Sequence, residues 1–308
     1  MTAKALKRDI VDRYDGNPII TAQDIPFPCN TVFNAGAVKH NGLYLLLLRV
    51  EGLEGKSALH LATSKDGFHF DIQEKPAMWP SEEEPYRTYE ELGVEDPRLT
   101  KMGDQYFIFY TAYSRYSPRI GLAKTRDFST FERVGLVSQP TNKDAVLFPK
   151  KFGNRFVRLD RPSTSGRQDM WISYSDDLIY WGDSRIVMEV RPGYWDCATI
   201  GAGVPPIETE KGWLEIYHGV RVTAGGRLYR LGCALFDLED PSKLIGRSGP
   251  AILSPREPYE RTGDVPNVVF TCGAVMEENG EVRIYYGAAD TCICVATASL
   301  HDLIDCCE

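Results

Sequence analysis

One strand-turn-strand unit recurs five times along this chain, and the repeat constrains the fold more than any other feature of the sequence. In each copy an apolar strand leads through a glycine-containing turn into a second strand rich in aromatic and β-branched residues. The turns read HNG, KMGDQ, KFGNR, ETEKG and EENGE. The second strands begin at Tyr44, Tyr106, Phe156, Trp213 and Val282. Five units of one kind predict five similar sheets.

A third strand follows each pair. These strands are expected within residues 57–70, 119–131, 169–181, 229–244 and 292–304. The copies lie about 50 to 70 residues apart, slightly more than the repeat length of familiar propeller blades, and no long amphipathic helix pattern interrupts them. We therefore predict an all-β fold, a five-bladed β-propeller that residues 1–308 form as a single domain.

The composition fits one large domain and argues against several classes of partner. The 308 residues are 43% hydrophobic, which is enough for a sizeable core. The segment Met1–Gly16 is charged throughout, and no run approaches the roughly 18 apolar residues of a membrane helix. The net charge is −8 and there is no long basic run, which argues against a nucleic-acid partner. We expect a cytoplasmic protein with no membrane partner.

The eight cysteines match neither a zinc framework nor a secreted disulfide scaffold. Cys292 and Cys294 are separated by one residue, and Cys306 and Cys307 are adjacent. We expect reduced thiols and no metal site.

Alignment of the second strands on their first residues brings basic side chains to one structural position. The sixth residues are Arg49, Thr111, Arg161, His218 and Gly287. Rotation about a propeller axis relates such positions, so we expect the three basic side chains to converge on one anion. The alternative is that each arginine pairs with an acid close by in sequence. Arg49 would then pair with Glu51. In the same way, Arg161 would pair with Asp160.

Asp96, in the string GVEDPR, is the candidate general acid. Its neighbours Val94 and Pro97 are expected to fix the backbone and limit solvation, which would raise the pKa of the carboxyl group. The alternative is a turn in which Asp96 caps backbone amides while Arg98 forms an ion pair. The string alone leaves both interpretations open.

Further polar residues are placed at the same end of the channel. Asp290 follows small residues in YYGAADT, which let a ligand approach the backbone, although an exposed turn acid fits the spacing equally well. Asn34, in FNAGAV, and the pair Lys143–Asp144, in NKDAVLFP, are expected just ahead of the first strands of blades one and three. An ordinary turn residue is the simpler interpretation of each.

Aromatic residues in the connections between blades are candidate sugar contacts, because sugar rings present apolar C–H faces. They include Tyr86, Tyr89, Tyr113, Tyr116, Tyr194 and Trp195. Residues 80–91 are interpreted either as a loop over the channel or as a charged surface loop.

In their order along the chain, FNAGAV, GVEDPR, KDAVLFPKK, DRPS, IYHGV and PNVVF…YYGAADT resemble the motifs of glycoside hydrolase family 130. The resemblance runs from Asn17 and Pro18 to about Asp305. It implies a five-bladed β-propeller that acts on β-mannosides, in most members by inverting phosphorolysis and in some by hydrolysis.

The resemblance also implies a role for each matching residue. It makes Asp96 the general acid, which protonates the leaving oxygen through the mannose 3-hydroxyl group. The implied phosphate ligands are Lys143, Arg161 and His218. The implied substrate-binding residues are Asn34, Arg49, Asp144 and Asp290. Some members have Arg-Asn where this chain has Lys143–Asp144, and a lysine binds phosphate as a point donor rather than as a fork.

The candidate site favours phosphorolysis over hydrolysis. An inverting hydrolase needs a second carboxylate, about 6.5 to 9.5 Å from the acid, to activate water, whereas phosphate is itself a nucleophile that cations can hold. The expected partners are a mannosyl oligosaccharide and inorganic phosphate, with no cofactor, and the product is α-mannose 1-phosphate. Hydrolysis with Asp144 or Asp290 as base is one alternative. A non-catalytic carbohydrate-binding propeller is another. The sequence leaves open the linkage (β-1,4 or β-1,2) and the acceptor sugar. It also leaves open whether the protein is a monomer or a homo-oligomer.

Overall fold

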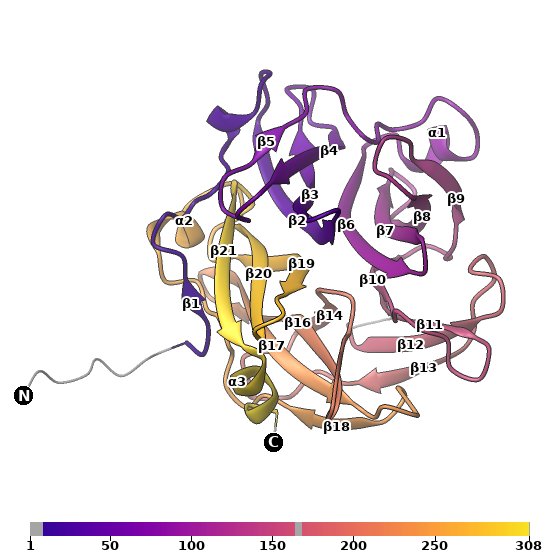
Figure 1. The fold of residues 1–308 in the computed structure, drawn as a ribbon, viewed down its shortest axis with the longest axis vertical. Coiled ribbons are helices and arrows are strands. Elements are labelled where there is room, and N and C mark those ends of the chain that lie inside the picture. Colours follow the sequence, from indigo (N-terminus) through magenta and orange to yellow (C-terminus); the bar gives the residue numbers. More distant parts are fainter. Residues whose placement is uncertain (1–8, 164–167, 308) are drawn as a thin grey trace, which may run out of the picture.

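The computed structural model describes residues 9–163 and 168–307, and its strands form blades arranged in chain order around one axis (Figure 1). Blade one contains β2 (Thr31–His40), β3 (Leu43–Glu51), β4 (Ser57–Ser64) and β5 (Asp71–Ile72). Blade two contains β6 (Gly93–Met102), β7 (Gln105–Tyr113), β8 (Arg119–Thr125) and β9 (Glu132–Leu136). Blade three contains β10 (Asn142–Leu147), β11 (Phe156–Pro162), β12 (Met170–Ser175) and β13 (Gly182–Met188).

The last two blades complete the ring. Blade four contains β14 (Thr199–Ala202), β15 (Ile207–Thr209), β16 (Gly212–Thr223), β17 (Gly226–Phe236) and β18 (Leu244–Arg247). Blade five contains β19 (Val269–Met276), β20 (Glu281–Ala288), β21 (Cys292–Ser299) and β1 (Asp12–Arg13). Neighbouring strands within the blades pair antiparallel. The predicted five-bladed β-propeller is confirmed.

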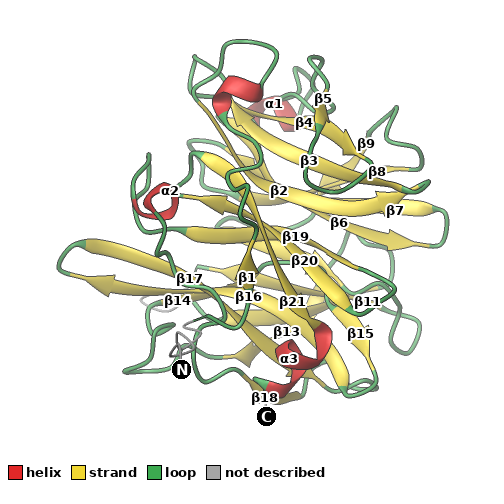
Figure 2. Ribbon diagram, turned by 60° about the vertical axis from the view of Figure 1, so that its left-hand side comes forward, coloured by secondary structure: helices red, strands yellow, loops and turns green. Residues whose placement is uncertain are grey.

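Helices are short and few in the described residues (Figure 2). They are α1 (Tyr86–Tyr89), α2 (Pro258–Arg261), α3 (Leu300–Asp305) and the 3-10 helix η1 (Ala22–Asp24). None of the helices within residues 9–163 and 168–307 is long and apolar enough to cross a membrane. All eight cysteines are free.

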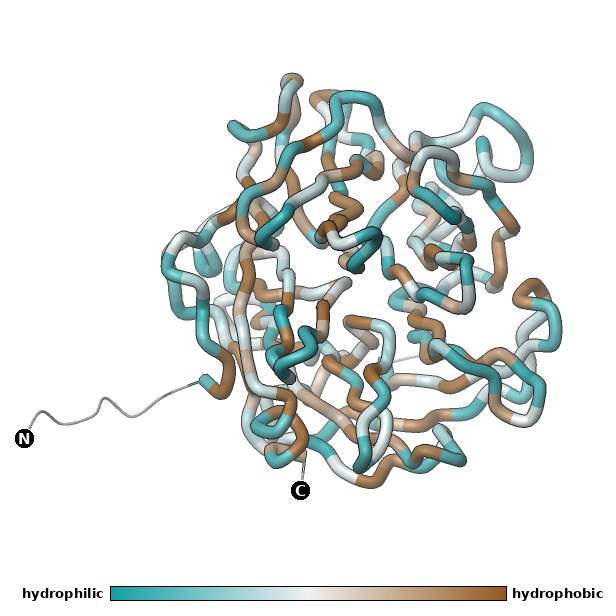
Figure 3. Tube along the Cα trace, in the orientation of Figure 1, coloured by the Kyte–Doolittle hydropathy of each residue, from teal (hydrophilic) through white to brown (hydrophobic). Residues whose placement is uncertain are grey.

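The hydrophobic core is divided among the interfaces between blades. Each of five large clusters of buried residues draws its members from two neighbouring blades, such as Leu47 with Ile108, Leu122 with Leu147, and Leu214 with Val282. This division follows from the strand pattern, because a sheet buried on both faces must pack against a neighbour on each side. Figure 3 shows the result as hydrophobic segments within the blades and hydrophilic segments in many of the connecting loops.

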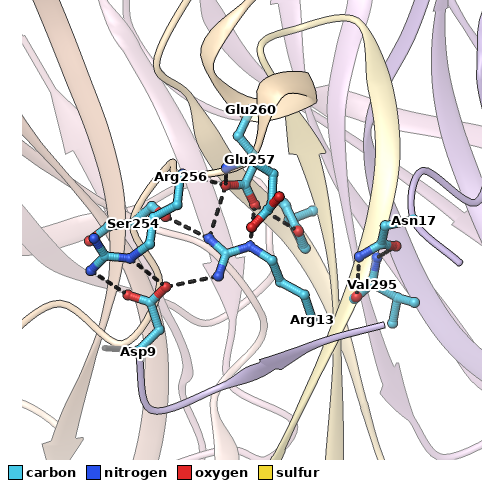
Figure 4. Close-up of polar contacts among 9 residues, drawn as sticks. Asp9, Arg13, Asn17, Ser254, Arg256, Glu257, Glu260 and Val295 are labelled. Carbon is cyan, nitrogen blue, oxygen red and sulfur yellow. Dashed lines mark hydrogen bonds and ion pairs between the residues drawn. The ribbon is translucent and has the colours of Figure 1, made fainter. Parts of the chain in front are cut away.

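The N-terminal segment closes the ring by adding β1 to the outer edge of blade five. Asp12 and Arg13 pair with β21, and the Arg13 guanidinium group donates to Glu260 Oε1 at 2.7 Å and to Asp9 Oδ2 at 2.8 Å (Figure 4). Arg256 contacts the same Asp9 carboxylate. The first and last parts of the chain therefore share one blade, which fixes the outer edge of the final sheet.

A hydroxyl-capped turn ends the third strand of each of the first three blades. The amide of the residue three positions on donates to the hydroxyl oxygen of Ser64, Thr125 and Ser175. That residue has a positive φ in each case, and it is Gly67, Phe128 or Leu178. Asp66 and Asp177 accept two further amides each. The small-residue, Ser/Thr/Asp pattern of the sequence thus encodes a turn held by side-chain caps.

Replacement of Ser64 by alanine is expected to lower the free energy of unfolding by about 1 kcal/mol. The Ser64 hydroxyl oxygen is buried and accepts the Gly67 amide at 2.9 Å, so its loss leaves a buried donor without a partner. Urea unfolding measures the change. Ser129→Ala, in the corresponding exposed turn of blade two, is the control and should change stability by less than about 0.5 kcal/mol. Equal losses in the two variants would contradict the capping role.

Candidate active site

Three polar side chains enter the site from equivalent β-bulges in blades one to three. The bulges interrupt the pairing of β2 with β3, β6 with β7, and β10 with β11. The bulged residues Asn34, Asp96 and Asp144 have φ values of 52°, 49° and 58°. Asparagine and aspartate tolerate this left-handed conformation better than other non-glycine residues. A bulge re-aims a side chain, so the local sequence itself directs these three groups inward.

This finding corrects one expectation. Asn34 and the pair Lys143–Asp144 lie inside β2 and β10, not ahead of them. The equivalence of F-N, E-D and K-D in the three first strands is visible in the sequence, and alignment of the first strands would have revealed it.

The alignment of the second strands is confirmed by the strand register. Each aligned residue lies opposite the first strand of its own blade: Arg49 opposite Phe33, Thr111 opposite Glu95, Arg161 opposite Lys143, His218 opposite Gly201, and Gly287 opposite Phe270. The local pairs offered as an alternative do not form in the structure. Arg49 contacts blade two, and Asp160 pairs with Arg158 at 2.9 Å.

Asp96 lies at the centre of a hydrogen-bonded group drawn from blades one and two. Its Oδ1 atom accepts from Asn34 Nδ2 at 2.9 Å and from Arg49 Nη1 at 3.0 Å. Arg49 Nη2 donates to Glu95 Oε1 at 2.7 Å, and Arg49 Nε donates to Ser57 Oγ at 3.0 Å. The Asp96 side chain is 5% exposed. The contacts hold one oxygen of the carboxylate in place and spread one guanidinium group over two acids.

The expected rise in the pKa of Asp96 is wrong for the protein without substrate. Burial does act to raise this pKa, but the positive charges of Arg49, Lys143 and Arg98 and the Asn34 hydrogen bond outweigh burial and hold it below its ordinary value. Val94 and Pro97 are both buried within β6, as anticipated. The direction of the pKa shift is nevertheless decided by positive charges, two of which come from other blades. Asp96 is therefore ionised before ligands bind.

Two neighbouring carboxyl groups show the opposite shift. Burial raises the pKa of Glu95 to about 6, against the attraction of Arg49. Burial likewise raises the pKa of Asp290 to about 6, again opposed by Arg49 and assisted by the negative charge of Asp96. Asp290 lies in the turn between β20 and β21 with φ of 53° and is mostly buried. Asp290 is therefore not the solvent-exposed turn residue that the sequence also allowed.

Asp290→Asn is expected to change how stability depends on pH. Because the folded-state pKa of Asp290 is raised from 3.8 to about 6, its carboxyl group contributes stability that is complete below the unfolded pKa and lost as pH rises through the folded pKa. Asparagine stays neutral. Relative to the parent protein, the variant should therefore gain about 2 kcal/mol of unfolding free energy between about pH 4.5 and 7.5.

Urea titrations at a series of pH values measure this difference. Asp104→Asn, at an exposed turn in blade two, should show no such trend and serves as the control. A pH-independent difference between Asp290→Asn and the parent would mean that Asp290 is not held in an environment that favours its neutral form.

Asp144 joins blades two, three and four. Its Oδ1 accepts from Arg98 Nη2 at 3.3 Å, its Oδ2 accepts from Arg161 Nε at 2.8 Å, and His218 Nε2 lies 3.6 Å from Oδ2. The Asp144 side chain is fully buried. Burial acts to raise its pKa, but the positive charges of Arg161, Lys143 and Arg98 hold the pKa far below its ordinary value. This geometry fits a residue that positions cations better than one that touches a sugar.

His218 is held neutral and tightly enclosed. Burial lowers its pKa to about 3 despite the nearby Asp144 carboxylate. Its Nδ1 atom is buried without a hydrogen-bond partner among the described residues, and its ring lies 4.5 Å from the ring of Phe270, centroid to centroid. A Cβ atom on Gly201 would come within 2.5 Å of His218 Cε1 and 2.7 Å of Asp144 Oδ2. Glycine at position 201 therefore allows this arrangement.

Arg98 is a site residue that the sequence analysis mentioned only as an ion-pair partner. It is buried and donates to the Asp96 backbone oxygen at 3.0 Å as well as to Asp144. It also contacts the backbone oxygens of Ala202 and Gly203. The charge of Arg98 therefore acts on both the acid and the cation cluster. The β-bulge at Asp96 interrupts the alternation of side chains along β6, so the spacing of Arg98 from Asp96 could not reveal this role from the sequence.

The candidate aromatic residues divide into exposed and structural groups. Tyr113, Tyr116 and Tyr194 are 40%, 55% and 52% exposed. Trp195 instead stacks on Tyr217 with ring centroids 5.6 Å apart, and its indole nitrogen donates to Gly249. Tyr86 and Tyr89 are partly buried, and each has an arginine over its ring, Arg133 and Arg119 respectively. The segment 80–91 contains α1, which lies at the outer edge of blade two in Figure 1.

Comparison with known proteins agrees with this geometry. Residues 3–308 match the glycoside hydrolase family 130 model, described as β-1,4-mannooligosaccharide phosphorylase. The chain is 36% identical to the β-1,4-mannooligosaccharide phosphorylase of Ruminococcus albus, over 97% of this chain and 91% of that protein. It is 40% identical to a 1,2-β-oligomannan phosphorylase of Thermoanaerobacter, over 88% of this chain and 91% of that protein.

A solved structure extends the similarity to three dimensions. The β-1,2-mannobiose phosphorylase of Listeria innocua, in complex with β-1,2-mannobiose, superposes with a TM-score of 0.88 and 33% identity, covering 97% of this chain and 99% of that chain. The repeat, the bulged acids and these matches give one answer. The chain belongs to glycoside hydrolase family 130, a family of mannoside phosphorylases.

Proposed function

We propose that the protein cleaves β-mannosides by inverting phosphorolysis, with Asp96 as the general acid, inorganic phosphate as the nucleophile and α-mannose 1-phosphate as the product. The observation that carries the proposal is the cation cluster around Asp144, in which Arg161 and Arg98 share one carboxylate and Arg98 also donates to the Asp96 backbone oxygen. An anion brought there lies close to the acid. The three proposed phosphate ligands are Lys143, Arg161 and His218. Lys143 lies opposite Arg161 in the strand register.

The reaction balances with these residues. A phosphate oxygen attacks the anomeric carbon from the face opposite the leaving group, and the bond from that carbon to the glycosidic oxygen breaks. The leaving oxygen receives a proton that originates on Asp96 and passes through the mannose 3-hydroxyl group. Asn34, Arg49 and Asp290 hold the mannose, and Asp144 orients the cations. The reverse reaction returns the proton to Asp96 and releases phosphate.

Phosphate itself supplies a reason for Asp96 to become protonated. In the protein without ligand, the pKa of Asp96 is low because Arg49, Lys143 and Arg98 are positive, against the effect of burial. A bound phosphate dianion offsets this positive charge, and it is a like charge for the carboxylate. Both effects raise the pKa of Asp96. The acid is thereby prepared only when the nucleophile is present, which limits unproductive protonation.

Hydrolysis is the second candidate, and Asp290 is the residue that favours it. Burial raises the pKa of Asp290 to about 6, a value suited to a general base near neutral pH. Asp144 is poorly suited to that role, because it is fully buried and the surrounding cations hold its pKa far below the ordinary range, against the effect of burial. A water activated by Asp290 would replace phosphate on the same propeller.

The deciding experiment incubates the protein with α-mannose 1-phosphate and a panel of acceptors, namely glucose, mannose, N-acetylglucosamine, and β-1,4- and β-1,2-mannobiose. Phosphate release that requires one acceptor supports phosphorolysis, and the linkage of the product identifies β-1,4 or β-1,2 specificity. The complementary assay follows mannobiose cleavage with and without phosphate. Cleavage that proceeds equally without phosphate would overturn the proposal in favour of hydrolysis.

A further inference from the structure

A second polar cavity lies between blades two and three, on the face of blade three turned away from the cation cluster. Its volume is about 620 Å³, within the range of small-molecule sites. Asn142 and Asp160 line it, and each directly precedes a residue of the proposed phosphate site, Lys143 or Arg161. Successive side chains of a strand point to opposite faces of the sheet, so β10 and β11 serve the two sites with alternate residues.

Three buried polar atoms of this cavity lack hydrogen-bond partners among the described residues. They are Asn142 Oδ1, Asp160 Oδ1 and Trp171 Nε1. The residues are neighbours, because Asn142 Nδ2 donates to Asp160 Oδ2 at 3.1 Å and Asp160 lies opposite Trp171 in the register of β11 and β12. Asn142 and Asp160 are 8% and 2% exposed. Buried polar atoms are normally paired, so two acceptors and one donor left open indicate a hydroxyl-bearing guest.

Of the two arginines that line the cavity, Arg158 is paired with an acid and Arg119 contacts a neutral backbone oxygen. Arg158 Nε donates to Asp160 Oδ2 at 2.9 Å, and Arg158 Nη1 donates to the Val137 backbone oxygen at 2.9 Å. The guanidinium group of Arg119 donates to the backbone oxygen of Ser138. A carbonyl oxygen is neutral, so the positive charge of Arg119 remains and disfavours a metal cation. The two open acceptor oxygens, Asn142 Oδ1 and Asp160 Oδ1, disfavour a phosphate, so the cavity favours a neutral ligand with hydroxyl groups.

Aromatic rings complete the cavity. Trp171, Trp181 and Tyr180 line it, and Tyr180 is 79% exposed, although its side chain is large and mostly apolar. Arg158 lies over the Trp181 ring at 4.3 Å from the centroid and, with the Trp181 indole donating to Leu178, fixes that ring in place. Rigid aromatic faces beside unpaired donors and acceptors are the combination that recognises sugar rings.

We propose that this groove between blades two and three is a second carbohydrate site, which binds a β-mannosyl oligosaccharide outside the catalytic channel. The identity of the sugar rests on the proposed function, whereas the presence of a neutral polyhydroxylated ligand rests on the groove itself. A chain held there is kept close to the channel on the other face of blade three. Its effective concentration at the catalytic site rises, so long chains gain more than disaccharides.

Ser184→Trp tests the proposal by filling the groove. Ser184 lines the cavity from the exposed strand β13, so a large side chain there occupies space without entering the core. In the phosphate-dependent cleavage assay we expect Ser184→Trp to raise KM for a β-mannohexaose about threefold to tenfold and to leave the kinetics on β-mannobiose unchanged. Tyr180→Ala, which removes one aromatic face, should give a smaller change in the same direction. Ile245→Ala, which removes an exposed apolar side chain from blade four, is the control.

Titration calorimetry with the same hexaose in the absence of phosphate gives an independent readout. Asp96→Asn protein should bind two equivalents, and the same protein with Ser184→Trp should bind one. A single equivalent in both, together with equal KM values for the hexaose, would overturn the groove as a sugar site even if phosphorolysis is confirmed. Absence of phosphorolysis with two equivalents bound would instead overturn the proposed reaction and leave the groove supported.

Discussion

Asp96→Asn is expected to lower the rate of phosphate release from mannose 1-phosphate and acceptor by about 10²- to 10⁴-fold, the range typical of a general acid–base group. Asparagine keeps the shape of the side chain and can still accept from Asn34 and Arg49, but it carries no transferable proton. The same loss should appear in the phosphorolytic direction, because one group serves both directions. Coupled assays of phosphate and of mannose 1-phosphate measure the two rates.

The effect must be separated from a loss of folding. Asp104→Asn, in the exposed turn at the other end of β6, should keep full activity and serves as the matched control. The thermal midpoint of Asp96→Asn should fall below that of the parent protein, because the positive charges that lower the pKa of Asp96 make its ionised form stabilising, so the rates are measured well below the midpoint of the variant. Retention of more than about a tenth of the parent activity in a folded variant would exclude Asp96 as the acid.

The propeller and part of its site follow from the sequence because both repeat. Five hairpins of one kind predict five blades, and alignment of the second strands places Arg49, Arg161 and His218 at equivalent positions, as the register confirms. Rotational symmetry converts a pattern along the chain into neighbourhood in space. For these residues no knowledge of distant contacts was needed.

The charge state of the acid did not follow from the sequence, because its causes lie in different parts of the chain. Val94 and Pro97 lie within two residues of Asp96 and suggest a raised pKa, whereas Arg49, Lys143 and Arg98, together with Asn34, determine the lowered one. Arg49 and Lys143 are 47 residues away from Asp96, on other blades. Local sequence reports burial, but the field at a carboxylate is a sum over all nearby charges.

The role of Asp144 shows the same limit. The sequence placed it beside a phosphate ligand and suggested contact with substrate, but its carboxylate is fully buried and contacts arginines of two blades. Only the assembled ring reveals that one acid contacts arginines of two blades and lies 3.6 Å from the neutral His218 of a third. A buried acid of this kind partly balances the positive charge of an anion site, which limits the cost of burying several cations together.

Arg161→Ala is expected to raise KM for phosphate about 10- to 100-fold, because one charge-assisted contact to an anion is worth about 1.5 to 3 kcal/mol. KM for the mannoside should change far less, since the guanidinium group lies with Asp144 and Gln168, away from the Asp96 group. Arg161→Lys keeps the charge but loses the planar fork. Its KM for phosphate should therefore lie between those of the parent protein and Arg161→Ala. Arg155→Ala, in the turn before the same strand, should leave both constants unchanged.

Initial rates over a matrix of phosphate and mannobiose concentrations separate these constants. An unchanged phosphate KM in Arg161→Ala, or an equal rise in both, would contradict the assignment, because a phosphate ligand must act selectively on the step that admits phosphate.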